Sequence, residues 1–115
     1  MPETGDIWFI DFGAPEPGQP AFRRPALLLA PSDPGEWLST SFLMVPFTTT
    51  DRDYAAAVEV RPSDANGLPR RSFAQVDMMR TLPDRACRTF VGRLDPQDWA
   101  IIRFVVSQYM GYVQA

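Results

Sequence analysis

Residues 95–111 have the sequence DPQDWAIIRFVVSQYMG, in which apolar residues recur at intervals of three and four. That spacing places apolar side chains on one face of a helix, so the segment predicts an amphipathic helix from about residue 96 to about residue 110. Asp95 suits the N-cap, Pro96 the first turn and Gly111 the end of this helix. Its apolar stripe, which we expect to cover a core, consists of Trp99, Ile102, Val106, Tyr109 and Val113, widened by Ile101, Val105 and Met110.

The sequence before this helix is divided into short apolar runs by twelve prolines among 115 residues. The runs are rich in β-branched and aromatic residues, which favour strands over helices. We expect Pro31 to end the second run and Pro46 to interrupt the third, because proline cannot donate a ladder hydrogen bond. The runs lie at residues 7–10, 26–30, 42–50, 57–61 and 73–82, the last with a bend.

Five short strands followed by one helix predict an α+β fold that is mostly β, a small and mainly antiparallel barrel with a C-terminal amphipathic helix. A chain of this length holds one hydrophobic core, so residues 1–115 are expected to form a single domain. The first residues do not resemble a signal peptide, and no apolar stretch approaches the roughly 20 residues that cross a bilayer. We therefore expect a cytoplasmic protein that does not bind membranes.

The chain contains no histidine, and all 11 of its basic residues are arginine. The absence of histidine excludes Ser-His-Asp, Cys-His and histidine-metal chemistry together. The single cysteine, Cys87, excludes an intramolecular disulfide and multi-cysteine zinc sites, and we interpret it as a packing thiol. Any catalysis must therefore use arginine, hydroxyls, carboxylates or backbone amides, and we expect neither a metal nor a cofactor.

Charge is unevenly distributed along the chain, although the formal net charge is only −3. Residues 1–60 hold nine acids and three arginines, whereas residues 61–93 hold seven arginines and three acids. The second segment predicts a local basic surface on an acidic protein. Arg70 and Arg71, next to the turn signal Asn66-Gly67, form its best candidate for a phosphate-contacting loop, because guanidinium groups bind phosphate bidentately.

Two further features are candidates for chemistry. Residues 23–25 read Arg-Arg-Pro at the start of the second run, and residues 45–50 read Val-Pro-Phe-Thr-Thr-Thr at the end of the third. Each is unspecific alone, since arginine pairs occur by chance and threonine runs favour strands.

Five blocks of this sequence, taken in order, closely resemble the MazF/PemK family of toxin endoribonucleases. They are GDIWFIDF (5–12), RPALLL (24–29), VPFTT (45–49), DMMRTL (77–82) and GRL (92–94), the last leading into the final helix. The resemblance spans essentially the whole chain. It implies an SH3-like barrel with a C-terminal helix, which agrees with the fold expected from the pattern.

The resemblance implies a toxin of a type II toxin–antitoxin system that cleaves single-stranded RNA without a metal. The ribose 2′-OH would attack the adjacent phosphate, leaving a 2′,3′-cyclic phosphate and a 5′-OH. The catalytic residues implied are Arg24 and Thr48, the arginine of the Arg-Pro block and the first threonine after the Val-Pro-Phe block. The implied partners are single-stranded RNA, a cognate antitoxin and a second copy of the chain in a homodimer.

The remaining expectations concern RNA contacts. Asp77 stands where relatives carry an acidic residue, and Met78 where many carry glutamine. Unpaired bases can stack on exposed aromatic side chains, for which Trp8, Phe22, Trp37 and Phe47 are candidates. The expected RNA-contacting residues are Arg23, Thr49, Arg70, Arg71, Asp77, Met78 and Arg80.

Two alternatives use the same barrel without catalysis. One is a topoisomerase poison like the CcdB toxins, although those proteins lack the Arg-Pro and Val-Pro-Phe-Thr pairing found here. The other is an inactive relative that acts as a decoy for the antitoxin. Both would leave RNA intact.

Overall fold

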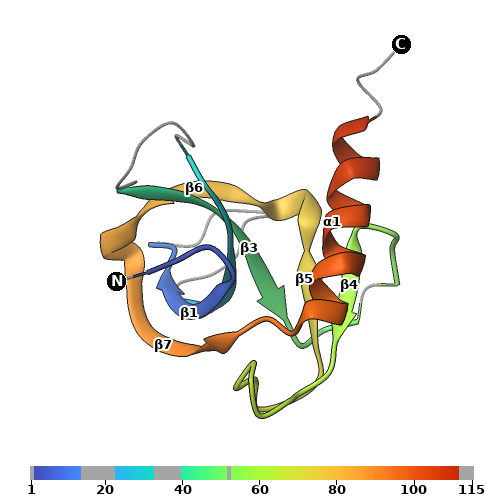
Figure 1. Cartoon of the computed structure of the whole chain (residues 1–115), viewed down its shortest axis with the longest axis horizontal. Coiled ribbons are helices and arrows are strands. Elements are labelled where there is room, and N and C mark those ends of the chain that lie inside the picture. The colour runs from blue at the N-terminus through green and yellow to red at the C-terminus, as the bar shows by residue number, and fades with distance from the viewer. Residues whose placement is uncertain (1, 14–22, 33–39, 52, 112–115) are drawn as a thin grey trace.

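Figure 1 shows a computed structural model of the chain, which describes residues 2–13, 23–32, 40–51 and 53–111. The strands are β1 (Asp6–Asp11), β2 (Arg23–Pro31), β3 (Ser41–Thr48), β4 (Ala57–Val60), β5 (Ser72–Gln75), β6 (Arg80–Pro83) and β7 (Cys87–Arg93). Two 3-10 turns, η1 (Val76–Met78) and η2 (Asp84–Ala86), flank β6, and one helix, α1 (Pro96–Gly111), follows β7. The helix and all five predicted strand regions are confirmed, the last as β5, η1 and β6.

All strand pairs are antiparallel, in the order β4-β5-β3-β2-β1-β7, with β6 also on β3. The first half of β3 pairs with β6 and its last residues pair with β5, so the sheet divides along this strand. Within the described residues β4 and β7 pair with one strand each, so the curved sheet does not close into a ring. The helix α1 lies beside β4 and β5 (Figure 1), and no helix in these ranges is long and apolar enough to cross a membrane. The mostly antiparallel fold with one C-terminal helix is thus confirmed, with the barrel open.

The central strands are buried on both faces, which explains their continuous apolar runs. Leu27 of β2 and Val45 of β3 pack in one cluster with Ile102 of α1. Leu28 and Met44, one residue along the same strands, pack in a second cluster on the opposite face. Neighbouring residues of a strand point to opposite faces, so each face of the pair faces a core of its own.

Two details of the strands differ from expectation. β7 was not predicted, because it is a mostly exposed edge strand whose sequence, CRTFVGR, lacks a clear apolar alternation. Its pairing with β1 is interrupted by two register shifts. Pro46 also lies inside β3, fully buried and opposite Ala26, and Pro31 belongs to β2. A strand tolerates proline wherever the missing amide hydrogen is not needed by its ladder.

The prediction that the apolar stripe of α1 covers a core holds for only part of the stripe. Ile102 is fully buried, and Trp99, Val105 and Val106 pack against the core. The exposed members are Ile101 (51%), Tyr109 (45%) and Met110 (53%), joined by Phe104 (63%), while Val113 lies outside the described residues. The core beneath a helix on the edge of a small sheet is too narrow to cover a stripe of this width.

Asp95 begins the helix in a different way from the one predicted. Its backbone carbonyl accepts hydrogen bonds from the amides of Asp98 (3.1 Å) and Trp99 (3.0 Å). Its carboxylate instead accepts hydrogen bonds from Ser63 Oγ (2.5 Å) and Asn66 Nδ2 (3.5 Å). The side chain therefore fastens the turn before β5 to the start of the helix.

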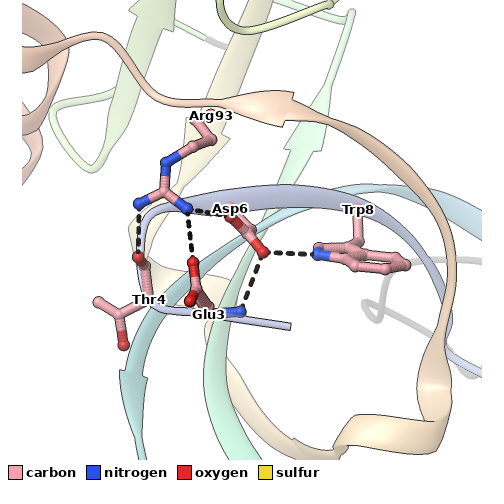
Figure 2. A network of polar contacts seen from close by, with 5 residues as sticks. All are labelled: Glu3, Thr4, Asp6, Trp8 and Arg93. Atoms are coloured by element: carbon pink, nitrogen blue, oxygen red, sulfur yellow. Dashed lines mark hydrogen bonds and ion pairs between the residues drawn. The ribbon is translucent and has the colours of Figure 1, made fainter. Parts of the chain in front are cut away.

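A buried carboxylate ties the N-terminus to the last strand (Figure 2). Asp6 is 3% exposed and accepts hydrogen bonds from the amide of Glu3 (2.9 Å) and from Trp8 Nε1 (3.0 Å). Arg93 of β7 forms an ion pair with Asp6, and it also reaches Glu3 at 3.3 Å and the Thr4 carbonyl at 3.2 Å. One acid thus joins the two ends of the sheet that are farthest apart in sequence.

Replacement of Asp6 by alanine is expected to destabilise the fold by about 1–3 kcal/mol, because three donors lose a buried acceptor. Urea denaturation followed by tryptophan fluorescence measures the change. Glu3→Ala is the matched control, since its exposed ion pair with the same arginine contributes at most about 1 kcal/mol. Equal losses in the two variants would contradict the role assigned to the buried acid.

Candidate active site

The pairing of β2 with β3 brings Arg24 and Thr48 together. Ala26 pairs with Pro46 in this register. Two residues further along each strand, the same register places Arg24 opposite Thr48 on one face. Arg24 Nη1 lies 3.5 Å from the carbonyl oxygen of Phe47, next to Thr48. Residues 24 positions apart in the sequence therefore meet at one end of the sheet.

A residue that the sequence did not single out joins this pair. Gln75, the last residue of β5, is 7% exposed, and its Oε1 lies 3.5 Å from Arg24 Nη1. Arginine carries only donors, so the amide must face it with its oxygen and direct its NH2 group elsewhere. A single glutamine at the end of an apolar run forms no motif, and only the pairing of β5 with β3 brings it to Arg24.

The threonine cluster at the end of β3 forms a local turn. Thr48 is half-buried, and its Oγ1 accepts a hydrogen bond from the amide of Thr50 at 3.2 Å. A hydroxyl that accepts one bond keeps its own hydrogen for donation. Thr49 is exposed beside it. The turn thus fixes the position of the Thr48 oxygen and leaves a donor at the site.

The 3-10 turn η1 follows Gln75 directly and carries the next two predicted residues. Asp77 is exposed and accepts a hydrogen bond from the Tyr54 hydroxyl at 3.0 Å. Met78 is half-buried. Tyr54 was also missed, because nothing in the sequence indicates that the segment before β4 folds against η1.

Comparison with known proteins identifies the family. The family profile described as "PemK-like, MazF-like toxin of type II toxin-antitoxin system" matches residues 3–109. The chain belongs to this family. No protein with a curated description matches the chain.

Solved structures of the family have the same fold as this MazF-like chain. It is similar to MazF of Deinococcus radiodurans, with a TM-score of 0.77, 22% identity and 96% of each chain covered. It is similar to an endoribonuclease of a mycobacterial species, solved in complex with its cognate antitoxin, with a TM-score of 0.75, 20% identity and both chains fully covered. It is also similar to the Mycobacterium tuberculosis toxin MazF-mt6, with a TM-score of 0.70, 24% identity, and coverage of 92% of this chain and 96% of that one.

The predicted phosphate-contacting pair, Arg70 and Arg71, lies in the loop before β5. Arg71 is within 3.8 Å of Asp51 and 3.7 Å of Glu59, and its guanidinium lies 5.1 Å from the centre of the Phe73 ring. Arg70 is exposed and forms no ion pair among the described residues. The charge of Arg71 is therefore partly neutralised in the fold.

The arginine-rich segment 61–93 does not form the separate basic surface that its sequence predicts. Four of its seven arginines form ion pairs with acids from the first 60 residues, a long-range neutralisation that a count along the chain cannot reveal. Those four are Arg61, Arg71, Arg88 and Arg93. Among the described residues Arg70, Arg80 and Arg85 form no ion pair.

The two remaining predicted arginines lie near the start of β2. Arg23 is exposed and pairs across the sheet with Asp11. Arg80, the first residue of β6, pairs with Met44, and its guanidinium lies 5.7 Å from the centre of the Phe12 ring. These two arginines therefore lie on the β1 side of Arg24, away from Arg71.

The aromatic residues proposed to stack bases are not placed as expected. Phe47 is 2% exposed, so it belongs to the core and cannot stack a base. Trp8 is half-buried, with its ring edge-on to Phe90 at 5.5 Å. Phe22 and Trp37 lie outside the described residues.

No group of three or more His, Cys, Asp or Glu side chains in the described ranges is arranged to hold a metal ion. Burial, and then the charges of Asp84 and Asp6, raise the pKa of the Cys87 thiol to about 11. A thiol with a raised pKa carries little thiolate at neutral pH and is a poor nucleophile.

Cys87 is therefore expected to react slowly with iodoacetamide in the folded protein. At pH 8 a pKa near 11 leaves about 0.1% thiolate, against about a quarter in an unfolded chain of ordinary thiol pKa, so unfolding in urea accelerates alkylation by about two orders of magnitude. Mass spectrometry of timed, quenched samples measures both rates. Equal rates would show that the thiol is not protected.

Proposed function

We propose that the chain is the toxin of a type II toxin–antitoxin system and cleaves single-stranded RNA without a metal. The observation that carries the proposal is the meeting of Arg24 and Thr48 across β2 and β3, with Arg24 Nη1 3.5 Å from both the Phe47 carbonyl and Gln75. Family membership and the similarity to an endoribonuclease support it.

In the proposed reaction the ribose 2′-oxygen forms a bond to the adjacent phosphorus while the bond from phosphorus to the 5′-oxygen breaks. The 2′-OH loses its proton and the 5′-oxygen gains one, which gives a 2′,3′-cyclic phosphate and a 5′-OH. Negative charge accumulates on the non-bridging oxygens in the transition state. Arg24 would stabilise that charge with its forked N–H donors.

Thr48 and Gln75 would support this step by position. The Thr48 hydroxyl can donate to a non-bridging oxygen and help to hold the attacking and leaving oxygens in line. Gln75 and the Phe47 carbonyl fix the direction of the guanidinium, and preorganised donors stabilise charge better than mobile ones. A guanidinium stays protonated in proteins, so the contribution of Arg24 is electrostatic rather than that of a base.

Other predicted RNA contacts fit a strand that crosses this end of the sheet. Arg23 and Arg80 lie on one side of Arg24, and Thr49, Asp77 and Met78 lie on the other, close to η1 and the end of β3. Arg70 and Arg71 would contribute less, since Arg71 already contacts two carboxylates.

The test is incubation of purified protein with a defined single-stranded RNA in EDTA, followed by mapping of the ends. We expect cyclic phosphate and 5′-OH ends, a loss of rate of at least about 100-fold in Arg24→Ala, and a smaller loss in Thr48→Ala. Arg61→Ala is the control, because this exposed arginine lies at the far end of β4.

Cleavage that requires Mg²⁺, 3′-OH ends, or full activity of Arg24→Ala would contradict the proposal. Intact RNA together with inhibition of gyrase supercoiling would favour a topoisomerase poison. Intact RNA with tight antitoxin binding and no toxicity would favour a decoy.

We also propose that the chain forms a homodimer and is inhibited by a cognate antitoxin. The complexes of related toxins with their antitoxins support the second partner. The exposed apolar side chains of Ile101 and Phe104, one turn apart on α1, support a second copy of the chain as the first. Large exposed apolar residues gathered on one face commonly mark an interface.

Phe104→Glu is expected to shift the protein from dimer toward monomer, because a charge would be buried at the interface. Light scattering coupled to size-exclusion chromatography at several concentrations measures the mass. Gln108→Glu, which adds the same charge one turn further along α1, is the comparison for effects of charge alone. A wild-type monomer at all concentrations, or a dimer unaffected by Phe104→Glu, would contradict the use of this face.

A further inference from the structure

A pocket of about 400 Å³ opens beside the candidate active site, where the end of β1 meets β6, η2 and the start of β7. Its apolar lining consists of Phe12, Leu82, Pro83 and Ala86, of which Phe12 and Ala86 are buried. Its polar lining consists of Asp11, Arg85 and Arg88. An apolar floor with cationic groups around it suits a nucleotide, whose base is flat and whose phosphate is anionic.

The arginines around this pocket outnumber the acids. Arg85 is exposed and forms no ion pair among the described residues, and Arg88 contacts only Asp11, at 3.5 Å. Asp11 is itself shared with Arg23, its partner across β1 and β2. Its pKa is lowered by the amide of Gly13, and then by the charges of Arg23 and Arg88, so it stays ionised and neutralises one arginine at most.

The lining also contains a platform for an aromatic ring. Arg80 lies over the ring of Phe12 with its guanidinium 5.7 Å from the ring centre. A planar guanidinium held in this way keeps its other face for stacking or for a phosphate. The raised pKa of Cys87, which packs beneath this region, keeps its thiol neutral and adds no negative charge.

The pocket is joined to the candidate active site through β3. Arg80 pairs with Met44, and Arg24 lies opposite Thr48 by continuation of the β2–β3 register. Met44 and Thr48 are four residues apart on one strand, so they share a face and lie about 13 Å apart. A single strand of RNA bound at Arg24 spans that distance within a few nucleotides.

We propose that this pocket is a second subsite for single-stranded RNA, which takes a nucleotide that flanks the cleaved bond. Arg85 and Arg88 bind its phosphate, and the apolar lining with Arg80 contacts its base. The inference rests on the proposed ribonuclease function for its ligand, but it concerns binding of the strand rather than chemistry at Arg24. It moves the main basic contact from the Arg70–Arg71 loop to the opposite flank of the site.

The test measures binding without cleavage, by fluorescence anisotropy with a single-stranded DNA of the sequence of the cleaved RNA, which lacks the attacking 2′-OH. We expect the double variant Arg85→Gln, Arg88→Gln to bind about tenfold or more weakly, and the salt dependence of log K to lose about 0.7 per contact. Arg61→Gln is the matched control for loss of one charge. Asp11→Asn is expected to bind more tightly than wild type.

Cleavage of the RNA by the same variants separates the two proposals. At saturating RNA the double variant is expected to keep the wild-type rate of a single turnover, whereas Arg24→Ala loses it. If the double variant binds with wild-type affinity and salt dependence while Arg24→Ala is inactive, the subsite is wrong and the ribonuclease proposal stands. If wild type cleaves no RNA but binds the strand through Arg85 and Arg88, the subsite stands as a nucleic-acid site and the ribonuclease proposal is wrong.

Discussion

The register between β2 and β3 is the constraint on which the site depends. Leu27 and Val45 pack into one core, and Leu28 and Met44 pack into the other. A slip of one residue would exchange the two sets between unlike cores, so burial on both faces fixes the pairing more strongly than burial on one face would. The meeting of an arginine with a threonine at the strand ends follows from leucines and valines several residues away.

The blocks that resemble the toxin family divide into structural and chemical ones. Gly5 adopts a φ of +95°, its amide bonds to the Leu28 carbonyl, and its own carbonyl accepts from the amide of Leu94. A Cβ at Gly5 would lie 3.1 Å from Arg93 Nη2, so the close approach also favours glycine. The GDIW and GRL blocks therefore close the sheet, while the candidate chemistry lies in the Arg-Pro and Val-Pro-Phe-Thr blocks. Similarity in the first pair of blocks supports the fold, and similarity in the second pair is the part that bears on activity.

Local pattern was enough to predict the helix, five strand regions and the turn at Asn66, because spacing and turn residues act over a few positions. It was insufficient where the outcome depends on long-range neighbours. β7 has no apolar alternation because it is an edge strand, and Gln75 becomes a site residue only through the pairing of β5 with β3. The basic segment was overestimated for the same reason, since Arg71 and Arg93 contact acids far away in the sequence. The extent of the stripe on α1 was overestimated because periodicity shows which residues share a face, not how far the core beneath it reaches.

The lack of histidine shapes the chemistry that this site can offer. Arginine, threonine and glutamine keep the same charge throughout the range in which histidine titrates, so the arrangement of donors around Arg24 is the same at every pH between about 5 and 8. Such a site cannot gain by moving a proton between its own side chains. Its effect must come from donors held in place before the substrate arrives, and the contacts of Arg24 with the Phe47 carbonyl and Gln75 supply that restraint. The fold therefore contributes to the proposed catalysis chiefly by rigidity, through the same strand register that joins the two buried cores.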